Sequence, residues 1–215
     1  MYAYHGLGLL ALRQGDLTRA LPRLERAMGL CQDADIPLLF PWIAAALGAA
    51  YALAGRGTDA VPLLTQAMER STATKTFVYQ TLCGLSLGEA QMLAGSLGEA
   101  HALTEGVLAL ARERQERGHQ AYALRLLGDI AARREPPDTV QAEAYYQDAL
   151  ALAEALGMRP LQTHCYRSLG ALYSQTDRAA LARAVLSTAI ELYRAMDMTF
   201  WLPEAESALA QVERP

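Results

Sequence analysis

Apolar residues recur along this chain at the spacing of an α-helix, and polar residues and glycines separate the apolar segments. Leu7 and Leu10, and then Leu21, Leu24 and Met28, lie three or four residues apart, which places their side chains on one face of a helix. The pattern predicts five helix pairs and one final helix from residue 203. The pairs are expected at 2–14 and 18–31, 38–54 and 58–71, 77–94 and 97–115, 119–134 and 139–156, and 160–175 and 178–196.

The pattern also repeats as a unit. A Leu-Gly dipeptide recurs at intervals of 40, 40, 40 and 42 residues, with its glycine at Gly8, Gly48, Gly88, Gly128 and Gly170. Small and large residues follow each glycine in a fixed order, as Ala20, Leu24 and Ala27 do in the first unit. A mid-helix glycine costs about 1 kcal/mol of helix propensity, so its repetition indicates close approach of a neighbouring helix. The sequence predicts an array of helix–turn–helix units that bury their apolar faces by stacking.

The limits of several helices are predicted from prolines, capping residues and glycines. Proline is tolerated in the first turn of a helix, where the amide has no intrahelical partner, so Pro22 predicts an N-cap at Thr18. Ser96, with a glutamate three residues later, has the spacing of a capping box. Gly118 and Gly157 suit the left-handed position that follows a helix C-terminus.

Composition narrows the class of protein. The chain has 215 residues, 52% of them hydrophobic, and a formal net charge of −4. It lacks an apolar run of the roughly 20 residues that span a membrane and a signal-peptide pattern, so we expect a cytoplasmic protein that makes no contact with membranes. We expect a single solenoid over 1–215. Its repeats would cover about 1–36, 37–75, 76–117, 118–158 and 159–198, with a C-terminal cap at 199–215.

The candidate chemistry is sparse. Cys31, Cys83 and Cys165 are far apart and have no metal-ligand spacing, so we expect reduced thiols, and the repeat position of Cys83 and Cys165 indicates small core residues. His164 and Cys165 are neighbours on a helix and point about 100° apart, which prevents them from acting as a base and nucleophile on one face. We therefore expect no catalytic residues, no cofactor and no metal, and the chain is interpreted as a non-enzyme.

The repeat resembles the tetratricopeptide repeat (TPR) in a lengthened form of about 40 residues, against a consensus of 34. The resemblance covers the whole chain and rests on the Leu-Gly dipeptides, the small positions and the aromatic residues Tyr51 and Tyr173. It departs from the family at the leading tryptophan, which is Tyr4 in the first unit, and at the terminal proline, which is missing. The resemblance implies an all-α, right-handed α-α superhelix whose first helices line a concave groove for protein ligands.

The family's groove positions map onto residues of different character in the two halves of the chain. In the N-terminal half they are mostly apolar, and in the C-terminal half they are polar and basic. The groove residues that the resemblance implies are Tyr2, His5, Trp42 and Glu89, followed by Tyr122, Arg125, Asp129, Arg133, His164 and Arg167.

Two of these groups admit two interpretations. Arg125, Asp129 and Arg133 are four residues apart and can form an intrahelical ladder worth about 0.2–0.5 kcal/mol per pair. Alternatively Arg125, Arg133 and Arg167 form a clamp for a carboxylate or phosphate, since guanidinium groups bind such anions bidentately. Trp42 either anchors a peptide or fills the seam between the first two units.

The C-terminal third carries a narrower resemblance. Residues 156–161, His164-Cys165, Leu169-Gly170, 193–198 and 200–202 look like the TPR tail of large bacterial signalling proteins, in which a class III adenylate or guanylate cyclase domain and an ATPase module come first. The single lysine, Lys75, is not part of a G-x-x-x-x-G-K phosphate loop. No cyclase or ATPase activity is therefore expected of this chain.

These patterns together favour a protein-interaction scaffold that binds a peptide or helix in the groove, with an acidic end near the arginines, as the regulatory tail of a larger bacterial signalling protein. The alternative is a self-associating array, a homodimer through the first repeat, where Tyr2 and Tyr4 begin a helix with no polar residue before them. Either another repeat has been removed in front of this helix, which we favour, or its face packs on a partner or a second copy. The acidic balance argues against nucleic acid as a ligand, because such binding depends on many phosphate contacts.

Overall fold

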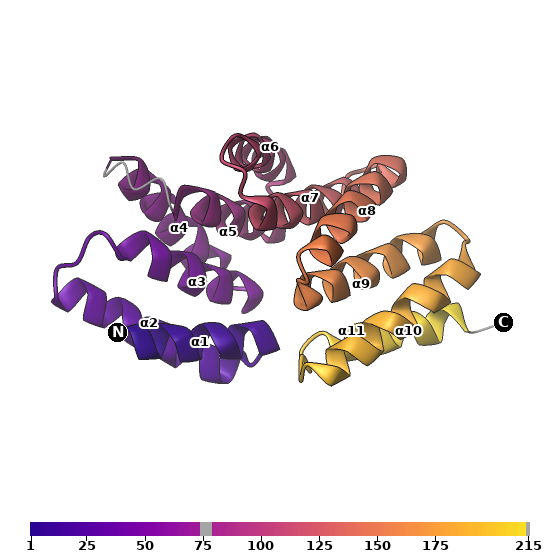
Figure 1. Ribbon diagram of the computed structural model, residues 1–215, viewed down its shortest axis with the longest axis horizontal. Coiled ribbons are helices and arrows are strands. Elements are labelled where there is room, and N and C mark those ends of the chain that lie inside the picture. The colour runs from indigo at the N-terminus through magenta and orange to yellow at the C-terminus, as the bar shows by residue number, and fades with distance from the viewer. Residues whose placement is uncertain (74–78, 214–215) are drawn as a thin grey trace. The chain divides into compact units, whose positions relative to one another are not determined.

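The computed structural model describes residues 1–73 and 79–213, and over these residues the chain forms eleven α-helices and no β-strand. They belong to two compact units, Met1–Gln115 and Glu116–Pro215 (Figure 1). The first unit contains α1 (Tyr2–Gln14), α2 (Leu17–Asp33), α3 (Phe40–Leu53), α4 (Gly57–Ala73), α5 (Gln80–Leu93) and α6 (Leu97–Glu113). The second contains α7 (Arg117–Ala132), α8 (Thr139–Ala155), α9 (Arg159–Gln175), α10 (Ala179–Ala195) and α11 (Leu202–Val212).

Each unit is built from pairs of consecutive helices. In the first unit α1 packs on α2, α3 on α4 and α5 on α6, and the first helices α1, α3 and α5 also pack on one another in order. In the second unit α7 packs on α8 and α9 on α10, and α11 covers α10 and touches α9. The predicted all-α fold of helix pairs and a final helix is confirmed over the described residues. The predicted helix start at 77 and the repeat limit between 75 and 76 lie outside them.

The repeated glycines lie where a second helix inserts a large side chain. A Cβ on Gly8 would lie 2.7 Å from Leu24 Cγ, and a Cβ on Gly128 would lie 2.5 Å from Tyr146 Cε1. The same overlap occurs in the second and fifth pairs, between Gly48 and Leu64 and between Gly170 and Leu186. In the third pair a Cβ on Gly84 would lie 2.5 Å from Val107 Cγ2. The predicted role of the small residues as helix contacts is confirmed.

One predicted N-cap is wrong. The α2 helix begins at Leu17, because the Asp16 side chain caps it and accepts a hydrogen bond from the Arg19 backbone N–H at 3.0 Å. Pro22 therefore lies inside the helix rather than in a first turn that begins at Thr18. The proline removes one backbone donor there, and the buried residues on either side, such as Ala20 and Leu24, keep the segment helical.

Of three further predicted limits, the one at Gly118 is wrong, and those at Ser96 and Gly157 are confirmed. Gly118 is the second residue of α7, and the left-handed residue in front of that helix is Gln115, with φ of 56°. Ser96 is the N-cap of α6, but within the described part of the chain its side chain makes no capping hydrogen bond. Gly157 has the predicted left-handed conformation, with φ of 66°. Polar residues thus adopt the left-handed conformation at some turns in place of glycine, as Asp177 also does with φ of 56°.

The cysteines are buried free thiols. Cys83 donates a hydrogen bond to the Pro41 carbonyl oxygen at 3.3 Å, and burial raises the pKa of both Cys83 and Cys165 to about 12. The prediction that these two are small core residues is confirmed. Among the described residues, no group of three or more His, Cys, Asp or Glu side chains could hold a metal ion. No helix in the described ranges is both long and apolar enough to cross a membrane.

Candidate functional site

The candidate residues of the first unit form a small aromatic cluster on α1 and α3. The His5 ring lies 3.7 Å from the Trp42 ring, centre to centre, and the Tyr2 ring lies 5.8 Å from it. His5 is only 2% exposed, whereas Tyr2 is 63% exposed. Burial lowers the pKa of His5 below its ordinary value of 6.5. In this cluster His5 is therefore buried against Trp42, Trp42 is half-buried and Tyr2 is exposed.

Glu89 lies half-buried on α5, at the position directly after the repeated glycine Gly88. The corresponding residue of α7 in the second unit is Asp129, which is also acidic. Both units therefore have an acidic residue directly after a repeated glycine. The residue is half-buried in the first unit and buried in the second.

Asp129 is the centre of a buried polar cluster that joins α7, α8 and α9. Its Oδ1 accepts hydrogen bonds from the Tyr146 hydroxyl at 2.8 Å and from the Ser168 hydroxyl at 3.1 Å. Its Oδ2 forms an ion pair with the Arg125 guanidinium one turn earlier on α7. In all three contacts the Asp129 oxygens accept hydrogen bonds, and these bonds offset the cost of burying the carboxylate.

Arg167 on α9 continues this cluster toward the final helix. Its Nη1 lies 2.6 Å from Glu204 Oε1 on α11, and the two side chains are 21% and 68% exposed. Burial lowers the pKa of Arg167, but Tyr193 and two carboxylates outweigh that effect and raise it. The buried Nε of Arg167 has no hydrogen-bond acceptor among the described residues. A partly buried cation is therefore paired with an exposed carboxylate.

An aromatic wall stands beside Arg167. His164 Nδ1 lies 2.9 Å from the Tyr193 hydroxyl, and the His164 ring meets the Trp201 ring edge-on at 4.8 Å. Trp201 also stacks near Tyr193, with centres 6.2 Å apart. Trp201 packs against the core cluster of α10 and α11.

The structure brings four of the six predicted residues of the second unit together, namely Arg125, Asp129, His164 and Arg167. Arg133 is exposed at the C-terminal end of α7, about 12 Å along the helix from Arg125 at 1.5 Å per residue. Tyr122 is half-buried near the start of α7. The predicted ion pair of Arg125 with Asp129 is confirmed, while the clamp of three arginines stays a prediction.

Four residues that were not predicted from the sequence complete the cluster, namely Tyr146, Ser168, Tyr193 and Glu204. Tyr146 could have been recognised from the sequence, because it occupies the repeat position that leucine fills in three other units. A hydroxyl in that buried position requires an acceptor nearby. Glu204 could not have been recognised in this way, because a glutamate on an amphipathic final helix is ordinarily solvated.

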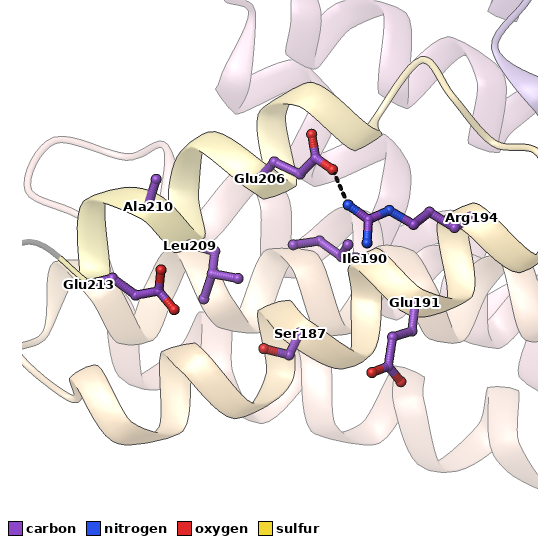
Figure 2. Close-up of a pocket in the computed structure, with 8 residues that line it drawn as sticks. All are labelled: Ser187, Ile190, Glu191, Arg194, Glu206, Leu209, Ala210 and Glu213. Carbon is purple, nitrogen blue, oxygen red and sulfur yellow. Dashed lines mark hydrogen bonds and ion pairs between the residues drawn. The ribbon is translucent and has the colours of Figure 1, made fainter.

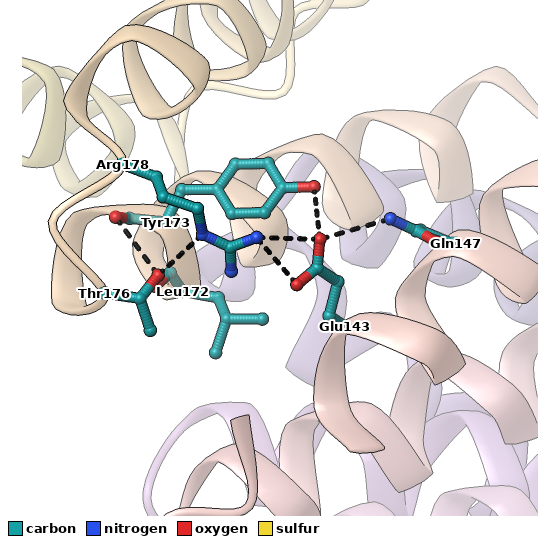
Figure 3. Close-up of polar contacts among 6 residues, drawn as sticks. All are labelled: Glu143, Gln147, Leu172, Tyr173, Thr176 and Arg178. Carbon is teal, nitrogen blue, oxygen red and sulfur yellow. Dashed lines mark hydrogen bonds and ion pairs between the residues drawn. The ribbon is translucent and has the colours of Figure 1, made fainter. Parts of the chain in front are cut away.

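A second kind of polar contact holds successive pairs together and is structural. At the seam of α8 and α9, Glu143 accepts a hydrogen bond from the Tyr173 hydroxyl at 3.1 Å and pairs with Arg178 at 2.8 Å (Figure 3). The Arg178 guanidinium lies 4.3 Å from the Tyr173 ring centre. The seam of α2 and α3 is closed in the same way by Glu25, Tyr51 and Arg56, with the guanidinium 4.0 Å from the ring.

Comparison with solved structures identifies the fold. The chain matches a Rap protein complexed with competence and sporulation factor, with a TM-score of 0.83 and 15% identity over 98% of this chain and 62% of that one. It matches the apo form of RapI with a TM-score of 0.70 and 12% identity, over 99% and 77% of the two chains. A scan against known family models gives no match, and a comparison with curated protein sequences gives none either.

A third match is a signal transduction ATPase with numerous domains from Pyrococcus horikoshii that has a tetratricopeptide repeat sensor. Its TM-score is 0.68 at 18% identity, and this chain covers 32% of its length. The chain therefore has a TPR-like helical-repeat fold. It spans less than two thirds of the Rap protein in complex and about a third of the ATPase.

Proposed function

We propose that this chain is a non-enzymatic protein-interaction scaffold that binds a peptide or a helix, and that Arg167 receives an acidic group of the ligand. The observation that carries the proposal is the contact of Arg167 with Glu204, in which a partly buried guanidinium is held by an exposed carboxylate from another helix. A ligand carboxylate that reaches the same place forms the same charge-assisted pair.

The neighbouring groups suit such a ligand. The Arg125–Asp129 pair is fixed by two hydroxyl donors and keeps its own charges balanced, so it supports α9 rather than competing for the ligand. His164 and Trp201 supply an aromatic wall on which an apolar ligand side chain can pack. In the first unit, Tyr2 and Trp42 supply a separate apolar contact of the kind found at the centre of protein interfaces.

The comparisons support the class of function without fixing the ligand. The Rap protein that this chain resembles was solved in a complex with competence and sporulation factor, and the archaeal ATPase uses its repeats as a sensor. We propose a cytoplasmic protein or peptide as the partner here, in preference to nucleic acid, because the net charge of the chain is −4.

Selection of peptides from a random library against the purified chain tests the proposal. We expect enriched peptides to contain an acidic residue, and their affinity to fall at least about tenfold with Arg167→Gln, because one charged partner is lost. Glu204→Gln has the opposite effect, since it removes the internal competitor for Arg167. Arg194→Gln and Glu206→Gln are matched controls, because these residues form an ion pair that links α11 to α10, whereas Arg167 and Glu204 link α11 to α9.

Equal binding by wild type and Arg167→Gln, or weaker binding by Glu204→Gln, contradicts the proposed site. Circular dichroism of each variant distinguishes a lost contact from a lost fold. If the selected peptides lack acidic residues and their binding is lost when Trp42 is substituted, the binding surface lies on the first unit.

We propose further that the chain is the regulatory tail of a larger bacterial signalling protein, with a cyclase or ATPase module in front of it. Its resemblance to such tails over residues 156–202, and its likeness to the sensor of a multidomain ATPase, support this. The reading frame that encodes the chain provides the test. A cyclase or ATPase domain upstream in the same frame supports the proposal, and a stop codon directly upstream contradicts it.

Self-association is a second candidate function, and exposed apolar residues on α1 favour it. Tyr2, Tyr4, Leu7 and Leu10 are between 44% and 63% exposed, and an apolar patch of this kind is typical of an interface. Sedimentation equilibrium tests it, because a dimer that Leu7→Arg converts to monomer supports self-association through the first repeat. A monomeric wild type at all concentrations contradicts it.

A further inference from the structure

The polar cluster of the second unit contains two guanidinium groups that are held in different ways. Arg125 pairs with Asp129, and these two side chains are only 12% and 10% exposed. Arg167 pairs with Glu204, which is 68% exposed. An exposed carboxylate turns into water at little cost, whereas separation of the Arg125–Asp129 pair leaves two almost buried charges without their partners. A ligand that reaches this cluster therefore meets the Arg167 guanidinium and not that of Arg125.

Two hydroxyl groups of the cluster are also in use. The Ser168 hydroxyl, on the residue after Arg167, donates a hydrogen bond to Asp129 Oδ1 at 3.1 Å. The Tyr146 hydroxyl donates to the same oxygen at 2.8 Å. Asp129 thus binds both hydroxyl groups as well as the Arg125 guanidinium, and none of these three donors is directed at a ligand.

The charges of the cluster favour one kind of anion. Arg125, Asp129 and Arg167 together carry a net charge of +1 when Glu204 has turned away. Both members of the pair act on Arg167: burial lowers its pKa, Asp129 raises it and Arg125 lowers it. A carboxylate carries one negative charge and balances the cluster. A phosphate monoester carries about −1.5 to −2 at pH 7 and leaves an excess of negative charge in a partly buried place.

The geometry of the donors agrees with this count. A single guanidinium presents two parallel N–H groups, which match the two oxygens of a carboxylate. The three terminal oxygens of a phosphate require further donors, and in this cluster Asp129 already holds the two hydroxyl groups.

We propose that Asp129 determines the specificity of the Arg167 site: because it binds Arg125 and both hydroxyl donors, the site accepts one carboxylate and excludes a phosphate group. This inference rests on the proposed function, since it concerns the ligand of the same site. The carboxylate belongs to an acidic side chain or to a peptide C-terminus, and the experiment distinguishes these two sources.

Four libraries of short, N-acetylated peptides provide the test, with all flanking positions drawn from uncharged residues. The central residue is glutamate in the first library, phosphoserine in the second and glutamine in the third, and these three have amidated C-termini. The fourth has a central glutamine and a free C-terminal carboxylate. Each library is passed over the immobilised full chain and over its Arg167→Gln variant at about pH 7.5, where phosphoserine carries close to two negative charges. The difference in retention measures the binding that depends on Arg167.

We expect this difference to be at least about fivefold larger for the better retained carboxylate library than for the phosphoserine library, because an excess charge disfavours the phosphate. Retention of the first library above the third assigns the carboxylate to a side chain. Retention of the fourth above the third assigns it to the C-terminus.

Two variants of the Arg125–Asp129 pair test the cause of the selectivity. Asp129→Asn preserves the size of the side chain and removes the charge that balances Arg125, so retention of phosphoserine peptides should rise at least about fivefold relative to carboxylate peptides. Arg125→Gln keeps Asp129 and its two hydroxyl donors, and it should lower the retention of phosphoserine peptides more than that of carboxylate peptides. Circular dichroism checks the fold of each variant, and the second variant keeps the test valid if the first does not fold.

Arg194→Gln is the matched control for an arginine of the same unit. Arg194 pairs with Glu206 at 2.5 Å and lines a hollow together with Glu191 and Glu213 (Figure 2). Three carboxylates surround this one guanidinium, so it attracts no anion and its substitution should leave the retention of every library unchanged.

The inference is overturned if phosphoserine peptides are retained through Arg167 as well as carboxylate peptides are. It is also overturned if neither Asp129→Asn nor Arg125→Gln changes the ratio of the two. Both results leave the proposed function in place, because Arg167 still binds an acidic ligand. If no library shows retention that depends on Arg167, the inference and the proposed function are overturned together.

Discussion

The two units make the same helix contact with different side chains. The contact joins Gly48 and Leu64 in the first unit, and Gly128 and Tyr146 in the second. In both, a large side chain from a second helix packs on a glycine of the first helix. Leu64 needs nothing but apolar neighbours, whereas the Tyr146 hydroxyl needs an acceptor and finds it in Asp129. The repeat therefore fixes where a large side chain goes and leaves its chemistry open.

This difference has consequences for each unit. An apolar contact is satisfied within its own helix pair, but the carboxylate of Asp129 also binds Ser168 on α9 and so ties two pairs together. Buried polar networks specify one arrangement when every partner is present and become costly when one is missing. The second unit is accordingly expected to be the more sensitive of the two to single polar substitutions.

The largest expected effect is that of Asp129→Ala, which removes the buried carboxylate that pairs with Arg125 and accepts the Tyr146 and Ser168 hydrogen bonds. We expect a loss of about 3–5 kcal/mol in the free energy of unfolding, measured by chemical denaturation. Hydrogen exchange should place the loss in α7, α8 and α9. Asp148→Ala, at an exposed aspartate of α8, should change stability by no more than about 0.5 kcal/mol. Equal effects of the two variants contradict the account of the cluster.

Tyr146→Phe isolates the hydroxyl from the rest of this contact. The ring still packs on Gly128, and Asp129 loses one of its three donors, so we expect a loss of about 1.5–3 kcal/mol, the range for a hydrogen bond to a charged group. The combined variant Tyr146→Phe and Asp129→Ala should lose less than the sum of the two single changes, because they share a partner. Strict additivity in this double-mutant cycle would show that the hydroxyl and carboxylate are not coupled.

Gly48→Ala tests the apolar version of the contact. The added methyl group overlaps the fully buried Leu64 side chain, and overpacking costs about 1–3 kcal/mol, of which about 1 kcal/mol is offset by better helix propensity. Gly106→Ala is the control, because a Cβ there meets nothing within 4 Å. It should stabilise the chain by up to about 1 kcal/mol. Thermal denaturation of both variants measures the difference, and stabilisation by Gly48→Ala would show that Leu64 can move aside.

The sequence was sufficient for the positions of the helices and the small residues, because periodicity and the repeat interval report directly on packing. The prediction failed at Thr18, because Pro22 favours a later helix start than the one that the Asp16 cap sets. The candidate site was predicted in part: helix spacing alone places Arg125 beside Asp129. The pairing of Arg167 with Glu204 could not be predicted, because it depends on where α11 lies on α9.

The smallest expected effect concerns His5. Among the described residues of the first unit, it is the only histidine or tyrosine that is buried. Burial lowers the pKa of His5 from 6.5, so the unfolded chain binds this proton at a higher pH than the folded chain does. The unfolded state then holds more protons between the two pKa values, and stability rises with pH in that interval. The contribution of His5 is complete above 6.5 and is lost as the pH falls through 6.5 toward the lowered value. His5→Phe keeps a ring against Trp42 and removes the titration. Unfolding free energies of both proteins above and below pH 6.5 should therefore show a steeper loss in acid for wild type, whereas parallel curves would assign the acid sensitivity to other groups.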